Sequence, residues 1–167
     1  MILVGLPGSG KTTIGQAVAE RLGRTFLDLD QEIERREGQS ISQIFGEKGE
    51  LYFRAKEREL TGELTLVGNM VIAPGGGWVG DPANIASVRP PSQLIYLRVR
   101  PETALKRLGP LRAMRPLLTR PDPLGELKRL LEARETAYQS ADHVVDTELL
   151  DLQRVIEMVT ELAPGSR

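Results

Sequence analysis

The residues with the most specific chemical pattern lie near the start of the chain, in the segment Gly5-Leu6-Pro7-Gly8-Ser9-Gly10-Lys11-Thr12. The segment fits G-x-x-x-x-G-K-[ST], the pattern of a phosphate-binding loop (P-loop) between a strand and a helix. Glycines let consecutive backbone N–H groups converge on phosphate oxygens, and the first turn of the following helix adds unpaired N–H donors. The pattern therefore predicts a nucleotide site, with a plain glycine turn as the alternative.

Two side chains of this loop are expected to carry its chemistry. Lys11 would reach the β- and γ-phosphates of a nucleoside triphosphate, and the Thr12 hydroxyl would ligate Mg²⁺. The other expected nucleotide contacts are Gly8, Ser9, Gly10 and Thr13. A P-loop does not reveal which molecule receives the phosphoryl group, so the acceptor must be inferred from other segments.

Two acidic residues are the first candidates for acceptor chemistry. Asp28 and Asp30 lie two apart at the end of a strand predicted over residues 25–29, where side chains at i and i+2 face the same way. Ligands bind at the carboxyl edge of a parallel sheet. One carboxylate could hold the water shell of the metal ion while the other accepts or orients a hydroxyl proton. The alternative is that Asp30 only caps a helix beginning at Gln31.

Two arginines and a glycine run are candidate anion contacts. Arg54 has Glu57 one turn further along a predicted helix, and Arg134 has acidic neighbours, so solvated ion pairs are the default interpretation. Gly75, Gly76 and Gly77 follow a predicted strand directly, and three consecutive glycines cost conformational entropy that a simple bend does not require. Backbone N–H groups presented to an anion would justify the run.

An irregular segment over residues 109–123 contains four prolines and shows no apolar period, which favours a lid. Its arginines, Arg112, Arg115 and Arg120, could close over a transferring phosphoryl group, or could belong to a solvated basic loop. The single histidine, His143, has no partner at metal-ligand spacing and is interpreted as structural. Phe53 and Trp78 are interpreted as core or pocket wall.

Composition excludes several classes of protein. The 167 residues contain no cysteine, which rules out disulfides, thiolate zinc sites, iron–sulfur clusters and cysteine nucleophiles. The formal net charge of −1 argues against a general binder of nucleic acids or membrane surfaces. No apolar stretch reaches the ~18 residues of a membrane span, and no leader pattern is seen. We expect a cytoplasmic protein.

The elements that position these residues alternate along the chain. Apolar runs predict five strands, over residues 1–4, 25–29, 70–73, 93–99 and 143–145. Periodicity and capping signals predict helices over 11–22, 31–37, 50–66, 82–88, 101–108, 123–140 and 150–162, with another capped by Ser40 or Ser42. This order predicts a three-layer α/β/α fold with a five-stranded parallel sheet. We expect one domain over residues 1–167, with an acceptor-binding region near 30–60.

In their order and spacing these motifs resemble shikimate kinases, which belong to the nucleoside-monophosphate-kinase branch of P-loop folds. The resemblance covers nearly the whole chain. It rests on GLPGSGKTT, on Asp28-Leu29-Asp30, on the segment Ile44-Phe45-Gly46-Glu47-x-Gly49-Glu50-x-Tyr52-Phe53-Arg54-x-x-Glu57, on Gly75-Gly76-Gly77, on Arg115-Pro116-Leu117-Leu118, and on Arg134 followed by Tyr138.

The resemblance implies ATP-dependent phosphorylation of the 3-hydroxyl of shikimate, with Mg²⁺ as cofactor. We expect a monomer that binds ATP and shikimate and has no nucleic-acid or membrane partner. By resemblance, Asp30 contacts the ring hydroxyls and is the base, and Asp28 lies near Mg²⁺. The same resemblance makes Arg54, Arg134 and a backbone amide of Gly75 to Gly77 grip the shikimate carboxylate.

On the nucleotide side, the resemblance places Arg115 on the lid near the transferring phosphate and Arg107 beside the adenine. The chain departs from the family pattern around the glycine run, after Asp146-Thr147, and in the length of segment 109–114. Pro74 precedes the glycine run, Trp78 follows it, and Glu148-Leu149-Leu150 replaces an arginine or proline turn.

Two other classes of function remain open. One is a different small-acceptor kinase of the same fold, such as a gluconate or nucleoside monophosphate kinase. The paired Arg54 and Arg134, with an apolar wall of Phe45, Phe53 and Trp78, suit a ring that bears one carboxylate. The other is a nucleotide-dependent switch that has no acceptor.

Overall fold

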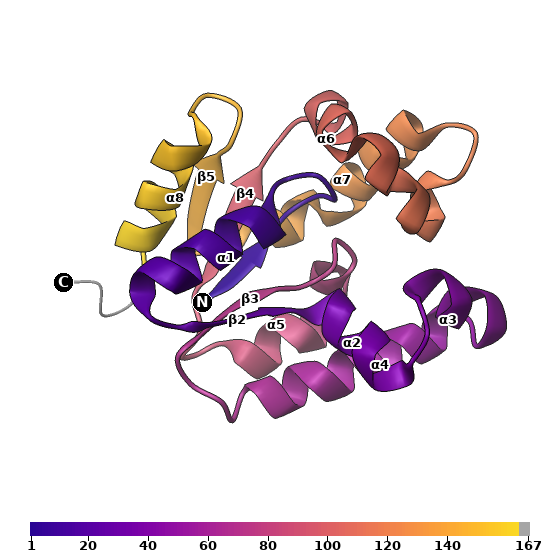
Figure 1. The fold of residues 1–167 in the computed structure, drawn as a ribbon, viewed down its shortest axis with the longest axis horizontal. Helices are drawn as coiled ribbons and strands as arrows, with labels where there is room; N and C mark the ends of the chain where they lie inside the picture. Colours follow the sequence, from indigo (N-terminus) through magenta and orange to yellow (C-terminus); the bar gives the residue numbers. More distant parts are fainter. Residues whose placement is uncertain (164–167) are drawn as a thin grey trace.

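A parallel sheet of five strands forms the centre of the molecule in the computed structural model, which describes residues 1–163 except the side chain of Leu117 (Figure 1). The strands are β1 (Ile2–Val4), β2 (Thr25–Asp28), β3 (Met70–Ala73), β4 (Leu94–Arg98) and β5 (His143–Asp146). Their order across the sheet is β2-β3-β1-β4-β5, and every neighbouring pair is parallel. The predicted sheet is confirmed, while the last four residues of the predicted domain lie outside the described residues.

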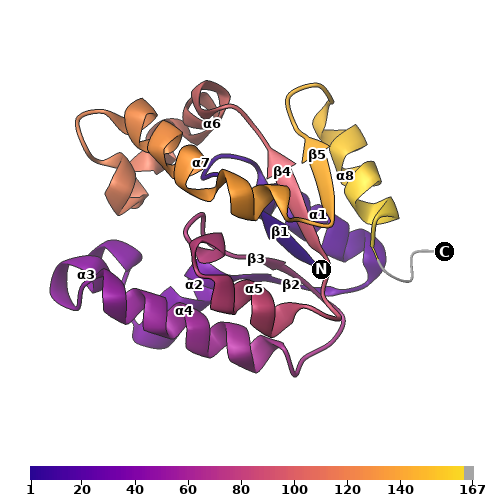
Figure 2. The same ribbon diagram turned by 180° about the vertical axis from the view of Figure 1, so that it is seen from behind.

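Helices connect successive strands and cover both faces of the sheet (Figures 1 and 2). The α-helices are α1 (Lys11–Leu22), α2 (Leu29–Glu37), α3 (Ile41–Glu47), α4 (Glu50–Leu64), α5 (Pro82–Val88), α6 (Pro101–Leu108), α7 (Pro123–Gln139) and α8 (Leu152–Glu161). Three short 3₁₀ helices are η1 (Trp78–Gly80), η2 (Gly109–Met114) and η3 (Pro116–Leu118). The lid segment is therefore not irregular throughout, because η2 and η3 lie within it.

Alternation along the strands divides the core into two layers. Ile2 and Val4 of β1 pack in one cluster with residues of α4, α5 and α7, whereas Leu3 between them packs in a second cluster with α1 and α8. Successive strand side chains point to opposite faces, so a strand that is apolar throughout is buried on both sides. This arrangement confirms the three-layer α/β/α class.

The backbone of helix α1 packs closely against strand β2 at Gly15. Gly15 is buried in α1, and a Cβ placed there would lie 2.5 Å from Cε2 of Phe26 on β2. Glycine at this position lets the helix lie closer to the strand than any other residue would. Gly23 ends the helix at φ 61°, and its N–H caps the carbonyl of Ala19, as the sequence predicts.

The junction between β2 and α2 differs from the sequence prediction. Helix α2 begins at Leu29, and its N-cap is Asp28, whose side chain accepts a hydrogen bond from the N–H of Gln31. Asp30 therefore lies in the first turn of the helix, so it neither caps the helix nor extends the strand. Ser40, rather than Ser42, caps α3, in a capping box with Gln43.

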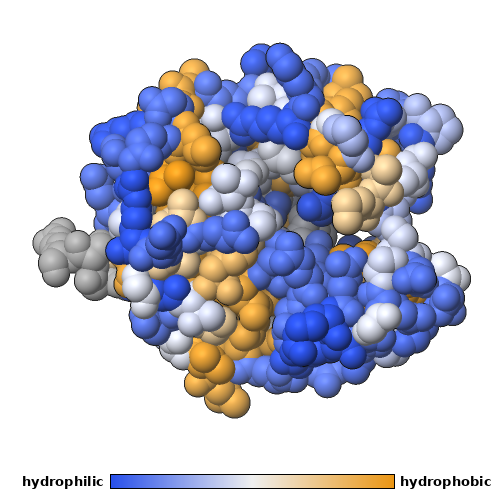
Figure 3. Space-filling view, viewed as in Figure 1, coloured by the Kyte–Doolittle hydropathy of each residue, from blue (hydrophilic) through white to orange (hydrophobic). Residues whose placement is uncertain are grey.

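At the carboxyl edge of the sheet two groups of helices stand apart. Figure 1 shows α3 and the beginning of α4 on one side, and α6 with the lid segment on the other. Figure 3 shows the surface hollowed between these two groups. Among the described residues, none of the helices has the length and apolar character to cross a membrane.

Candidate active site

Two adjoining cavities open at the carboxyl edge of the sheet, with volumes of about 450 and 420 Å³. Asp28, Asp30, Thr12, Gly75 and Arg115 line both, so the two cavities meet at these residues. The first cavity extends toward α3 and α4, and the second extends along the P-loop toward α8. The site can therefore hold two molecules end to end.

The P-loop adopts the backbone conformation that its glycines predict. Gly8 and Gly10 have φ of 84° and 95°, and a Cβ on Gly8 would collide with the carbonyl of Ala104. Lys11 Nζ donates hydrogen bonds to the carbonyls of Gly5 and Leu6, at 2.8 and 2.9 Å. Burial, together with the Arg115 guanidinium, lowers the pKa of Lys11 to about 7. A nucleotide phosphate would restore the full charge of this ammonium group.

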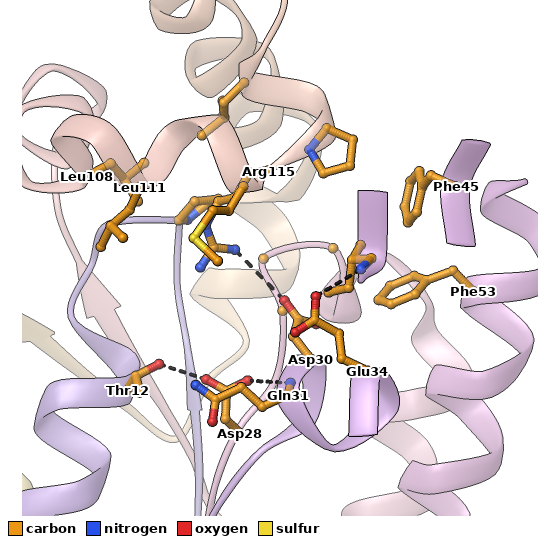
Figure 4. Close-up of a pocket in the computed structure, with 18 of the residues that line it drawn as sticks. Thr12, Asp28, Asp30, Gln31, Glu34, Phe45, Phe53, Leu108, Leu111 and Arg115 are labelled. Atoms are coloured by element: carbon orange, nitrogen blue, oxygen red, sulfur yellow. Dashed lines mark hydrogen bonds and ion pairs between the residues drawn. The ribbon is translucent and has the colours of Figure 1, made fainter. Parts of the chain in front are cut away.

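Thr12 and Asp28 form an oxygen-rich pair below the P-loop. The Thr12 hydroxyl donates to Oδ2 of Asp28 at 2.8 Å, as Figure 4 shows. Among residues 1–163 no three acidic or histidine side chains gather as a metal site. Mg²⁺ in kinases commonly takes one or two protein oxygens and completes its shell with phosphates and water. The pair therefore fits a magnesium ion.

Asp30 lies where the two cavities meet. Its carboxylate is 3.8 Å from the guanidinium of Arg115, and its Oδ1 is buried without a hydrogen-bond partner in the described part of the chain (Figure 4). Burial raises the pKa of Asp30, and Arg115 opposes the shift. A buried carboxylate with a raised pKa is a stronger base than an exposed one, and a hydroxyl donor would satisfy its free Oδ1.

The two predicted clamp arginines line the first cavity from two different helices. Arg54 comes from α4, and Arg134 comes from α7, 80 positions later in the chain. Arg134 donates from Nη1 to the carbonyl of Gly76 at 2.6 Å, and burial lowers its pKa. Taken from their neighbours alone, both arginines were expected to form solvated ion pairs on the surface. That default interpretation is wrong, because both line the cavity.

The pairing of Arg54 with Glu57 is also different from a solvated one. Nη1 of Arg54 bonds Oε2 of Glu57 at 2.8 Å, and the side chain of Glu57 is only 1% exposed. Burial raises the pKa of Glu57 to about 7, and the nearby Arg54 opposes the shift. The buried carboxylate holds the guanidinium of Arg54 in position at the cavity wall.

The glycine run has a cause that the sequence did not reveal. None of the three glycines has a positive φ. Instead, a Cβ on Gly75 would lie 2.6 Å from Oδ1 of Asp30, and one on Gly77 would lie 2.6 Å from the guanidinium carbon of Arg54. A Cβ on Gly76 would lie 2.8 Å from Pro7. The run is glycine because three side chains from distant segments press against it, and not because the backbone needs special conformational freedom.

The aromatic wall is confirmed for two of its three predicted members. Phe45 and Phe53 line the first cavity with ring centroids 5.1 Å apart. Trp78 does not line it: the indole is 1% exposed in the core, and its Nε1 donates to the Thr61 hydroxyl at 2.9 Å. The indole thus donates to a residue 17 positions earlier in the chain, and the ring packs in the core instead of lining the cavity.

Arg107 lines the second cavity, at the end away from the acceptor. It donates from Nη1 to the hydroxyl of Thr147 and from Nη2 to its carbonyl, both at 2.8 Å. Thr147, Leu150 and Leu152 line the same end. The loop after β5 is shaped by Asp146, whose carboxylate accepts from the N–H groups of Glu148 and Leu149. These hydrogen bonds to Asp146 form the turn at residues 146–149, where the family pattern has an arginine or a proline turn.

Of the three lid arginines only Arg115 reaches the two cavities. Arg120 pairs with Glu126 at 3.2 Å, and Arg112 lines a separate hollow of about 370 Å³ together with Arg120. Leu111 and Met114 of the lid and Glu34 of α2 also line the first cavity, and none of the three is predicted from the sequence. Glu34 could have been found, because it follows Asp30 by one helical turn.

A parallel sheet with this strand order, a P-loop after β1, and an adjoining first cavity lined by Arg54, Arg115 and Arg134 together define a P-loop kinase for a small acceptor. A family model described as shikimate kinase matches residues 7–163. The chain belongs to the shikimate kinase family.

Individual relatives agree with this assignment. The chain is 42% identical over 163 residues to a shikimate kinase of Symbiobacterium thermophilum, covering 96% of this chain and 94% of that one. The solved structure of a shikimate kinase from Acinetobacter baumannii in complex with shikimate matches with a TM-score of 0.91 at 36% identity, covering 96% of this chain and 90% of that one. A Sinorhizobium meliloti gluconokinase matches with a TM-score of 0.60 at 16% identity, covering 96% and 88%, which is a likeness of fold alone.

Proposed function

We propose that the protein phosphorylates the 3-hydroxyl of shikimate with ATP, giving shikimate 3-phosphate and ADP. The observation that carries this proposal is the convergence of Arg54 and Arg134 on one cavity that adjoins the P-loop. Two guanidinium groups can bind one carboxylate through paired, charge-assisted hydrogen bonds. The N–H groups of Gly75, Gly76 and Gly77 donate no hydrogen bond within the described part of the chain and are available to the same carboxylate.

In this mechanism the protein mainly positions the two substrates and neutralises charge. The carboxylate held at Arg54 and Arg134 would direct the reacting ring hydroxyl toward Asp30. Asp30 would accept the hydroxyl proton as the oxygen bonds to the γ-phosphorus. Lys11 and Arg115, which flank Asp30, would balance the charge on the phosphoryl oxygens.

Mg²⁺, when bound, would draw charge from the β- and γ-phosphate oxygens. Thr12 and Asp28 would hold the ion, directly and through its water shell. The segment 109–123 would act as the lid that excludes water, because it supplies Arg115, Leu111 and Met114 to the cavity walls. We further infer that the protein acts as a monomer, because residues of one chain supply the P-loop, both clamp arginines and the lid arginine; size-exclusion chromatography with light scattering tests this.

One assay tests the function. ADP release is measured with shikimate, gluconate, AMP and CMP offered in parallel at equal concentration. Stimulation by shikimate alone supports the proposal. Stimulation by gluconate or a nucleotide would favour another kinase of this fold, and slow hydrolysis that no acceptor stimulates would favour a nucleotide switch.

A further inference from the structure

Glu34 is the one carboxylate of the first cavity that the mechanism above does not use. It lies on α2, four residues after Asp30, so the two side chains lie on the same face of the helix. Figure 4 shows both carboxyl groups directed into the same cavity, with Glu34 on the side of α3.

One oxygen of Glu34 is fixed by the backbone. Oε1 accepts a hydrogen bond from the N–H of Ile41, the first residue of α3, at 2.8 Å. Ser40 and Gln43 already form a capping box at this end of α3, so Glu34 adds a third link to the helix. Its other oxygen accepts no hydrogen bond within residues 1–163. The carboxylate is thus held in one orientation with an acceptor to spare.

The charges around the cavity limit what that oxygen can bind. Three guanidinium groups line the cavity, those of Arg54, Arg115 and Arg134, and Asp28, Asp30 and Glu34 oppose them. The carboxylate of an acidic acceptor is attracted to the arginines and repelled by Glu34. The group that meets Glu34 must therefore be a neutral donor, and on a polyhydroxylated ring that donor is a hydroxyl.

The position of Glu34 along α2 indicates that this hydroxyl is not the reacting one. Asp30 lies beside Arg115, at the junction with the nucleotide cavity. Glu34 lies about 6 Å further along the helix axis, away from that junction. We propose that Glu34 is a specificity residue whose free oxygen accepts a hydrogen bond from a ring hydroxyl of shikimate that is not phosphorylated. This inference rests on the proposed function. Because Phe45 lies on α3, the same carboxylate also links hydroxyl recognition to the apolar wall.

The test compares acceptors as well as variants. Steady-state kcat/KM is measured for shikimate and for 4-deoxy- and 5-deoxyshikimate, each of which lacks one non-reacting hydroxyl. The matched control is Glu32→Ala, because Glu32 lies on the same helix, pairs with Arg35 and Arg36, and does not line the cavity.

In the wild type we expect shikimate to be preferred over one deoxy analogue by roughly 10-fold to 100-fold, the effect of one hydrogen bond to a charged group. Glu34→Ala should abolish that preference and leave the preference over the other analogue intact, whereas Glu32→Ala should change neither. If Glu34 only caps α3, all three acceptors lose activity by the same factor, and the inference is overturned.

Glu34→Gln serves if the alanine variant does not fold. The amide oxygen can still accept from the N–H of Ile41, so α3 keeps its link. The preference for shikimate over the same analogue should then fall about 3-fold to 10-fold, because a neutral bond replaces a charged one. An unchanged preference would overturn the inference. A wild-type protein that does not phosphorylate shikimate would instead overturn the proposed function, and this inference with it.

Discussion

Replacing Gly77 with alanine tests whether the position of Arg54 controls acceptor binding. The φ of Gly77 is −84°, so alanine can adopt the backbone conformation. The new Cβ would lie 2.5 Å from Nη1 and 2.6 Å from Cζ of Arg54, while ordinary contacts begin at 3.4 Å. The guanidinium must therefore move by about 1 Å, which a flexible side chain can do.

We expect this movement to weaken shikimate binding in a protein that still folds. A displacement of ~1 Å at a substrate-positioning group can cost ~100-fold, and losing one charge-assisted contact costs ~1.5–3 kcal/mol. The KM for shikimate should therefore rise roughly 10-fold to 100-fold in Gly77→Ala, while the KM for ATP stays unchanged. The free energy of unfolding should fall by ~1–3 kcal/mol, because Glu57 loses part of its pairing, offset by ~0.4–1 kcal/mol from replacing a glycine.

The assay is coupled ADP release with either substrate varied, and the control is Gly80→Ala. A Cβ on Gly80 would meet its nearest atom, Nε of Arg134, at an ordinary 3.8 Å. This control should keep both KM values. A wild-type KM for shikimate in Gly77→Ala would refute the argument that position 77 is glycine in order to leave room for Arg54.

Three further outcomes follow from the site. In Lys11→Ala, kcat should fall by at least ~100-fold because the phosphate charge loses its main cation, and near-normal turnover by the purified variant would contradict this. Arg134→Ala should raise the Kd for shikimate, measured by calorimetry, roughly 10-fold to 150-fold without changing the Kd for ATP. An unchanged Kd for shikimate would remove this arginine from the clamp. Burial raises the pKa of Glu57 from 4.5 to about 7. Between these two pH values the folded protein holds a proton on Glu57 that the unfolded chain releases. The stability contributed by this protonation is therefore lost as the pH rises from 4.5 to about 7. Urea denaturation at about pH 5 and pH 8 should show this loss, on the order of 3 kcal/mol, in the wild type but not in Glu57→Gln, and equal pH dependence in the two proteins would disprove it.

Local patterns predicted the elements and the nucleotide loop well. The P-loop is a contiguous pattern, and helices such as α1 and α6 have the predicted bounds because periodicity and caps are encoded within a few residues. The junction at Asp28 and Asp30 was harder. Either aspartate can accept the hydrogen bond from a helix N-terminus, and the sequence does not say which one does.

What the sequence could not reveal depended on contacts between distant segments. The cause of the glycine run is the approach of Asp30, Pro7 and Arg54, which lie at least 23 positions away in the chain. The orientation of Trp78 depends on the Thr61 hydroxyl. The roles of Arg54 and Arg134 came from resemblance, since each arginine alone has the neighbours of a surface residue.

The close approach at Gly15 has a consequence for the magnesium pair. Thr12 lies in the first turn of the helix that carries Gly15, and Asp28 is the last residue of the strand that carries Phe26. The distance between α1 and β2 therefore sets how far apart the two oxygen ligands lie. A single methyl group at position 15 would act as a wedge between helix and strand and would widen the 2.8 Å separation of the ligands. Substitution of Gly15, which lines neither cavity, is therefore expected to be tolerated as poorly as substitution of Thr12 or Asp28.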